Sequence, residues 1–218
     1  MSGSMVPISD EQAKLGQEIL KTLRGAGSAI WEALGSTPED LVAYFGGDWL
    51  RVRRAENLVK LFEKAKQRLA DWNVQQPKPA SLSIAIPILQ GAADEDREEL
   101  ADLWARLLAN AMAPNLDSVR HGFIEAVKKM DRQDALVLRE LNKRNLVAVQ
   151  RSTSDPQRTT IDNLAAAIDL RVDDVETSLR HLQSMDFFDQ QQVGNMDWYV
   201  NPTFREFMRA CYPEVIPK

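Results

Sequence analysis

The clearest pattern of apolar and polar residues runs from residue 94 to residue 112. Its apolar side chains recur every three or four positions: Leu100, Leu103, Trp104, Leu107, Leu108 and Ala111. This spacing places them on one side of an α-helix, which has 3.6 residues per turn. Asp94 can cap the helix, acidic residues fill its first turns and Pro114 ends it. The pattern therefore predicts a long amphipathic helix.

A second apolar stripe predicts a helix over residues 49–72, with Val52, Ala55, Val59, Phe62 and Leu69 on one side. This segment has seven basic and three acidic residues, whereas residues 94–106 have six acidic and two basic. Matching stripes and opposite charge predict that the two helices pack together as an antiparallel pair. The proline-containing link over residues 73–91 should run extended and then form a short turn of helix at residues 88–93.

Shorter amphipathic patterns lie on either side of this pair. Ser9 can cap a helix that carries Leu15, Ile19, Leu20 and Leu23 on one side. A second short helix should begin at Thr37 and Pro38, after an uncharged segment around Trp31. Phe123, Ile124, Val127 and Met130 predict a further helix over residues 119–130.

From Asp131 onward the pattern changes. The predicted elements are helices over residues 131–142, 161–168 and 172–185, strands over 146–149, 187–193 and 197–200, and a last helix after Pro202. Gly194-Asn195 is a β-turn signal between the last two strands. Helix, strand, helix, turn, helix and β-ribbon is the order of a winged helix-turn-helix. We expect a mostly α protein, with a helical domain over residues 1–130 and a winged-helix-like α+β domain over residues 131–218.

Composition adds limits on the class of protein. Hydrophobic residues make up 44% and charged residues 27%, which is ordinary for a soluble globular chain. The net charge of −5 gives no bulk attraction to nucleic acid or to an anionic membrane. A single cysteine, Cys211, fits a reducing compartment. The N-terminus lacks a signal-peptide pattern, and the longest uncharged run, residues 79–93, is too short to span a bilayer. These features predict a cytoplasmic protein.

Two segments carry a family resemblance. GGDWLRVRRAENLVKLFEKAKQRL at residues 46–69 and DEDREELADLWARLLANAM at residues 94–112 resemble the paired signatures of the abortive infection alpha family, a bacterial group assigned to anti-phage defence. The link between them and HGFIEAVKKMDRQDALVL at residues 121–138 are similar to that family as well. The resemblance spans roughly residues 48–185. It implies a biological role in defence, and it implies no catalytic or binding residues.

The residues themselves offer little chemistry. His121 and His181 lie sixty residues apart and Cys211 is the one cysteine, so neither a zinc spacing nor a Cys–His nucleophile pattern is present. The acidic cluster over residues 94–99 is expected at a helix start. Gly25-Ala26-Gly27 lacks the lysine of a phosphate-binding loop. We therefore predict no catalytic residues, no cofactor, no metal site and no enzymatic activity.

Contacts with a partner are the remaining kind of site. The start of the would-be recognition helix carries Asp173, Asp174 and Glu176, which would repel phosphate, so strong nucleic-acid binding is not expected. The five tryptophans are interpreted mainly as packing residues. The candidate partner-contact residues are Trp31, Asp173, Asp174, Glu176, Arg180 and His181.

Three hypotheses follow. The leading one is a non-enzymatic component of abortive infection that binds other proteins, such as a companion defence protein, a phage component or a second copy of the chain. The second is a winged-helix DNA-binding regulator, which salt-dependent DNA binding would favour. The third is a membrane-perturbing effector that uses residues 25–45 for peripheral membrane contact, which liposome leakage would favour.

Overall fold

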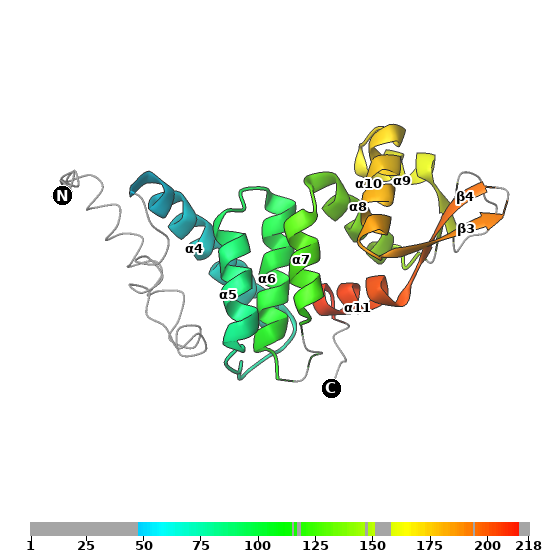
Figure 1. The fold of residues 1–218 in the computed structure, drawn as a ribbon. Coiled ribbons are helices and arrows are strands. Elements are labelled where there is room, and N and C mark those ends of the chain that lie inside the picture. The colour runs from blue at the N-terminus through cyan, green and yellow to red at the C-terminus, as the bar shows by residue number, and fades with distance from the viewer. Residues whose placement is uncertain are drawn as a thin grey trace.

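The computed structural model describes residues 48–114, 116, 119–146, 148–150, 158–193 and 195–213 (Figure 1). These residues form a mostly helical protein with one small mixed sheet. The helices predicted before residue 48, the segment 25–45 and Trp31 lie outside the described residues.

The first half is a group of neighbouring helices. They are α4 (Asp48–Asp71), α5 (Leu82–Ala93), α6 (Glu98–Met112) and α7 (His121–Lys129). The predicted stripe of α6 faces inward: Trp104 is only 1% exposed, and Phe62 of α4 is fully buried. Because α4 packs along α6, the predicted contact between these two helices is confirmed. Burial of their stripes is the main stabilising contribution, at roughly 1.5–3 kcal/mol per large side chain.

The direction of α4 relative to α6 differs from the prediction. Lys64 forms an ion pair with Glu98, and Arg68 forms one with Asp102. A step of four residues along α4 is thus matched by a step of four in the same direction along α6, so the two helices run parallel. The antiparallel prediction is wrong because α5 lies between them in sequence and reverses the chain one additional time.

The sequence pattern predicts too short a helix at α5, because the helix contains Pro87. Proline removes one backbone donor, and a sequence pattern read locally takes it as a break. Here neighbouring helices bury Ala85, Ile88, Leu89 and Ala92. This burial stabilises the helix on both sides of Pro87. The link therefore holds a helix of 12 residues rather than a single short turn.

The start of α6 also differs from the prediction. Asp94 does not cap α6: it is the residue that follows α5, and it pairs with Arg54 of α4. Glu95 is buried and accepts hydrogen bonds from both the backbone and the guanidinium of Arg97. The helix begins only at Glu98. The acidic run over residues 94–99 therefore includes the turn between α5 and α6 as well as the first turn of α6.

The second half combines helices with the sheet. It consists of α8 (Arg132–Lys143), β1 (Ala148–Gln150), β2 (Arg158–Thr160), α9 (Ile161–Ile168), α10 (Val172–Ser184), β3 (Phe188–Val193), β4 (Asn195–Val200) and α11 (Pro202–Cys211). The strand order is β2-β1-β4-β3; β3 and β4 form an antiparallel hairpin, β1 pairs antiparallel with β4, and β2 pairs parallel with β1. The sequence analysis predicts no strand at β2, because three residues give no periodic signal.

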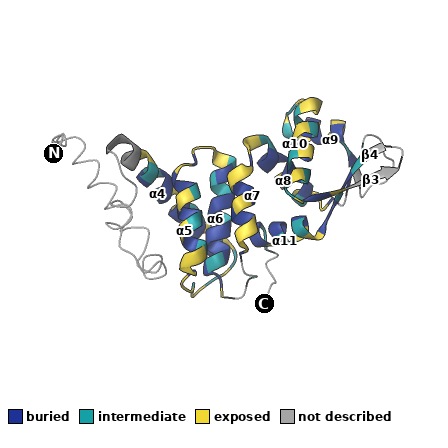
Figure 2. Cartoon of the chain, viewed as in Figure 1, coloured by how far each residue is buried: buried dark blue, intermediate teal, exposed yellow. Residues whose placement is uncertain are grey.

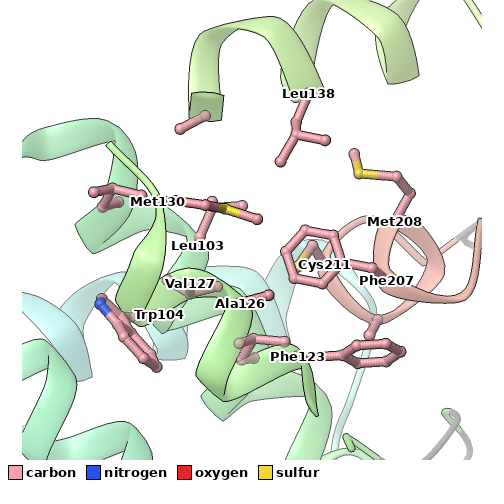
Figure 3. Packing of buried hydrophobic residues seen from close by; sticks show 14 of the residues in the cluster. Leu103, Trp104, Phe123, Ala126, Val127, Met130, Leu138, Phe207, Met208 and Cys211 are labelled. Carbon is pink, nitrogen blue, oxygen red and sulfur yellow. The ribbon is translucent and has the colours of Figure 1, made fainter. Parts of the chain in front are cut away.

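The last helix, α11, returns to the first half of the chain. Figure 3 shows Phe207, Met208 and Cys211 of α11 beside Phe123 of α7 and Leu103 of α6. The rings of Phe123 and Phe207 meet edge to face with centroids 5.5 Å apart. One apolar cluster thus continues from the N-terminal helices into the C-terminal half. The division into residues 1–130 and 131–218 stays a prediction.

A polar network holds the same junction. Asp102 of α6 accepts hydrogen bonds from Arg68 of α4 at 2.9 Å and from Arg106 at 2.7 Å. Arg106 also donates to the carbonyl of Cys211 at 3.3 Å, and its guanidinium lies 4.1 Å from the ring centroid of Tyr212. Burial raises the pKa of Tyr212 to about 12. The network therefore connects α4, α6 and the end of α11.

None of the described helices combines the length and the apolar character needed to cross a bilayer.

The contact between Gly91 of α5 and Trp104 of α6 gives a test of this packing. A Cβ atom added at Gly91 would lie 2.5 Å from Cζ2 of Trp104, so Gly91→Ala should lower the free energy of unfolding by about 1–3 kcal/mol through overpacking. At Gly122 of α7 nothing lies within 4 Å of an added Cβ. Gly122→Ala should therefore stabilise the protein by about 0.5–1 kcal/mol. Urea unfolding of both variants measures the contrast, and equal effects would contradict this packing.

Candidate functional site

The strongest candidate site lies where the start of α8 meets the end of α10. Nδ1 of His181 and Oδ2 of Asp134 are 2.7 Å apart. Val175, Leu179 and Leu182 are buried on the inner side of α10, which packs against α8. This packing places His181, in the last turns of α10, over the first turn of α8. Two residues that are 47 positions apart in sequence are therefore brought together by the tertiary structure.

The local structure of α8 fixes Asp134. Asp131 caps the helix by accepting a hydrogen bond from the backbone N–H of Asp134 at 3.1 Å. Asp134 in turn accepts one from the backbone N–H of Asp131 at 3.0 Å. This reciprocal arrangement is a capping box, which satisfies two backbone donors that a helix start leaves without partners. The carboxylate of Asp134 is therefore held in one orientation by both the helix start and the imidazole.

The two partners differ in exposure. The side chain of Asp134 is completely buried, whereas that of His181 is 37% exposed. Burial raises the pKa of Asp134 above its usual value, and the hydrogen bonds from Asp131 and His181 only partly oppose that shift. The second carboxylate oxygen, Oδ1, is buried and has no hydrogen-bond partner within the described part of the chain.

A buried carboxylate that orients an exposed imidazole is an arrangement also used for general bases and for metal ligands. Asp131, Asp134 and His181 each offer a ligand atom, and these atoms lie within 4.8 Å of one another. Their hydrogen bonds, however, already connect them to one another and to the helix start. The hydroxyl of Ser184 donates to the backbone carbonyl of His181, not to its ring. We interpret the cluster as a hydrogen-bonded clamp between α8 and α10.

The clamp interpretation makes a prediction about metal. Purified protein should hold no stoichiometric zinc, because binding through the ring nitrogen and Oδ2 would have to break the bond between His181 and Asp134. Elemental analysis after dialysis measures the content. One equivalent of zinc in the parent that is lost in His181→Ala would show that the cluster is a metal site instead.

The predicted partner-contact residues fall in two environments. Asp173, Glu176 and Arg180 are spaced three and four residues apart, so they share one face of α10. Asp173 is 82% exposed and pairs with Arg171 at 3.2 Å, and Glu176 pairs with Arg180 at 2.7 Å. Asp174 is partly exposed. His181 points instead toward Asp134 and belongs to the clamp.

Sequence reasoning did not single out Asp131 and Asp134 as site residues. Two aspartates three positions apart at the start of a predicted helix are a capping signal, and that signal was available. The contact of Asp134 with His181 could not be predicted from the sequence, because it depends on how α10 packs against α8. The other histidine, His121, is exposed as the first residue of α7.

Comparison with known proteins gives one result. The model of the abortive infection alpha family matches residues 53–211, which is most of the chain and includes both α6 and the His181–Asp134 clamp. Searches of curated proteins and of solved structures found no match. The family match agrees with the resemblance of residues 46–69 and 94–112, and it suggests a role in abortive infection defence. The chain therefore belongs to the abortive infection alpha family.

Proposed function

We propose that the protein is a non-enzymatic, cytoplasmic component of abortive infection defence against phage. It acts by binding another protein, either a companion defence protein or a phage component, through the exposed face of α10. Family membership supports the defence role. The observation that carries the mode of action is the mixed charge of that face, where Asp173 and Glu176 lie near Arg180 and Arg171 of the N-cap pairs with Asp173.

We infer that α8 to β4 form a winged helix-turn-helix, in which α10 is the second helix of the motif and β3 and β4 form the wing. In DNA-binding members of this class the second helix enters the major groove with its N-terminal residues first. Here Asp173 and Asp174 occupy the first turn of α10. Carboxylates at that position would repel the phosphate backbone.

Mixed charge suits a protein partner better. Opposite charges that alternate over a surface select a partner with the complementary pattern and raise the rate of association. Arg171 and Asp173 are both largely exposed, so a partner can reach them. The salt bridges between them contribute little to folding, since exposed pairs are worth about 0–1 kcal/mol. We therefore propose that these charged residues function in recognition of a partner.

The element order also favours a second function, a DNA-binding regulator. Its test is a mobility shift with genomic DNA fragments at physiological salt. We expect only weak, non-specific binding, and a nanomolar, sequence-selective shift would replace the protein-binding proposal. The membrane-effector alternative depends on residues 25–45, which lie outside the described residues, and leakage from liposomes tests it directly.

The experiment for the main proposal is a plaque assay on a sensitive host that expresses the gene, with and without its neighbouring genes. Asp173→Lys combined with Glu176→Lys should reduce protection at least tenfold and abolish capture of the partner from infected cells. Asp162→Lys combined with Asp189→Lys makes the same change in net charge on exposed positions of α9 and β3, and it should leave protection intact.

Two outcomes would contradict the proposal. Equal protection by both double variants, at equal soluble protein levels, would remove α10 as the contact surface. A single Asp, Glu or His whose replacement abolishes protection while fold and partner capture are retained would reveal an active site and contradict the non-enzymatic proposal.

A further inference from the structure

The imidazole of His181 has a second ring nitrogen, Nε2, that the clamp does not use. Nδ1 is 2.7 Å from Oδ2 of the fully buried Asp134, whereas the His181 side chain is 37% exposed. Nε2 is accessible to solvent and has no hydrogen-bond partner within the described part of the chain. Figure 2 shows exposed and half-buried positions along α10, beside the buried side that packs on α8.

The clamp fixes the chemical character of Nε2. Oδ2 of Asp134 already accepts a hydrogen bond from the backbone N–H of Asp131 at 3.0 Å, and a carboxylate has no hydrogen to donate. Nδ1 is therefore the donor in its contact with Oδ2, and it carries the one ring proton of a neutral imidazole. Nε2 is left with a lone pair and no hydrogen, so His181 presents a hydrogen-bond acceptor to solvent.

The two hydroxyls beside His181 are acceptors as well. Thr177 and Ser184 lie one turn before and one turn after it on α10, and both are exposed. Oγ1 of Thr177 donates to the carbonyl of Asp173 at 2.8 Å, and Oγ of Ser184 donates to the carbonyl of His181 at 2.6 Å. Because each hydroxyl uses its one hydrogen within the helix, it offers only oxygen lone pairs to a partner.

These groups form a stripe of acceptors along α10. Spacings of three, four and three residues place its members on one side of the helix: Asp174, Thr177, His181 and Ser184. The exposed carboxylate of Asp131 lies next to the stripe, within 4.8 Å of a ring nitrogen of His181. The flanking Arg180 is paired with Glu176 at 2.7 Å. This acceptor stripe thus combines negative charge with neutral acceptors.

We propose that the acceptor stripe binds a lysine- or arginine-rich segment of the protein partner, in which a cationic N–H group donates to Nε2 of His181. This inference rests on the proposed function, because it names the chemistry that the exposed face of α10 recognises. Lysine and arginine side chains have several donors and no acceptor, so they match a surface of acceptors. The carboxylates of Asp131 and Asp174 add complementary charge.

The stripe is also prepared for such a partner. The imidazole is held by Asp134, and both hydroxyls are held by helix carbonyls, so few side chains must be ordered on binding. A nucleic-acid backbone fits the stripe less well, because phosphate oxygens are acceptors and neither surface then supplies a donor. A basic protein segment is therefore the occupant that the chemistry of the stripe favours.

NMR of the full chain tests the acceptor and its ligand. Long-range proton–nitrogen spectra at about pH 8, where an unperturbed imidazole is neutral, should show His181 protonated at Nδ1 and bare at Nε2. The first probe is an amidated peptide of alternating arginine and glycine, which should shift Nε2 and the backbone amides of Thr177 and Ser184. The control peptide, with glutamate in place of arginine, should shift none of them at the same ionic strength.

The variant His181→Asn separates the two roles of the imidazole. The asparagine amide can replace Nδ1 as the donor to Asp134, but it has no group at the position of Nε2. The unfolding midpoint should therefore stay within about 3 °C of the parent, while the affinity for the arginine peptide falls at least fivefold. Thr177→Val removes one acceptor at constant size and should weaken the peptide at least twofold. Ser83→Ala, which removes an exposed hydroxyl of α5, should leave its affinity unchanged.

A proton on Nε2, peptide-induced shifts that lie away from α10, or equal peptide affinity in the parent and His181→Asn would each overturn the proposal. In the plaque assay His181→Asn should reduce protection at least tenfold. Protection that survives in His181→Asn but is lost in the Asp173→Lys, Glu176→Lys double variant would overturn this inference and leave the proposed function standing. Protection that survives in both would remove α10 as the contact surface and overturn the two proposals together.

Discussion

Replacement of Trp104 by alanine should lower the free energy of unfolding by about 3–5 kcal/mol. The indole is 1% exposed and lies against Gly91 of α5. It belongs to the buried apolar cluster, part of which Figure 3 shows. Its Nε1 has no hydrogen-bond partner in the described part of the chain. The loss is therefore one of apolar burial and packing, and it leaves a cavity that neighbouring helices fill only in part.

Urea unfolding followed by far-UV circular dichroism measures this effect without relying on tryptophan fluorescence. The matched control is Leu82→Ala, which removes an apolar side chain that is mostly in solvent and should change stability by less than about 0.5 kcal/mol. A Trp104→Ala unfolding curve that superimposes on that of the parent would show that the α5–α6 packing is wrong.

Replacement of Asp102 by alanine should lower the free energy of unfolding by about 2–4 kcal/mol at pH 7. Asp102 is the common acceptor for Arg68 and Arg106, and all three side chains are partly buried. Without the carboxylate, Arg106 loses its ion-pair partner and Arg68 keeps only the more exposed Asp71, and breaking a partly buried pair from one side is destabilising. Glu98→Ala, which removes an exposed partner of Lys64, should lose less than about 1 kcal/mol.

The effect of Asp102 should depend on pH in a defined direction. Burial opposes its ionisation, but the hydrogen bonds and charges of Arg106 and Arg68 outweigh burial and hold the pKa below 3.8. Because the folded pKa is lower than the unfolded one, the carboxylate stabilises the protein fully above about pH 4, and this contribution is lost as the pH falls through the folded pKa. The difference in stability between the parent and Asp102→Asn should therefore shrink toward pH 2.

The contribution of Asp134 to stability should depend on pH with the opposite sign, which provides an internal control. Its folded pKa is raised above 3.8, chiefly by burial, so its charged form is disfavoured in the folded protein. As the pH falls through that raised pKa, the parent should gain stability relative to Asp134→Asn. Unfolding measured over the acidic range in both variants checks the two trends, and trends of the same sign would contradict these environments.

The sequence by itself determined the elements whose signals are local. The stripe of α6 and the burial of Trp104 follow from residues three and four positions apart. The helix over residues 161–168 has the predicted bounds, because Thr160 caps it by accepting a hydrogen bond from the backbone N–H of Asn163. Opposite charge on residues 49–72 and 94–106 also predicted which helices are neighbours, because complementary faces pack in either direction.

Only the tertiary structure decided direction and long-range pairing. The parallel arrangement of α4 and α6 depends on α5, a helix that forms through Pro87 because its buried side is held by other helices. Asp94 faces Arg54 forty residues away, and His181 meets Asp134 across 47 residues. No local pattern encodes such contacts, since they depend on where the chain reverses and on which helices then pack together. For this reason the acidic turn before α6 and the α8–α10 clamp became visible only in the folded protein.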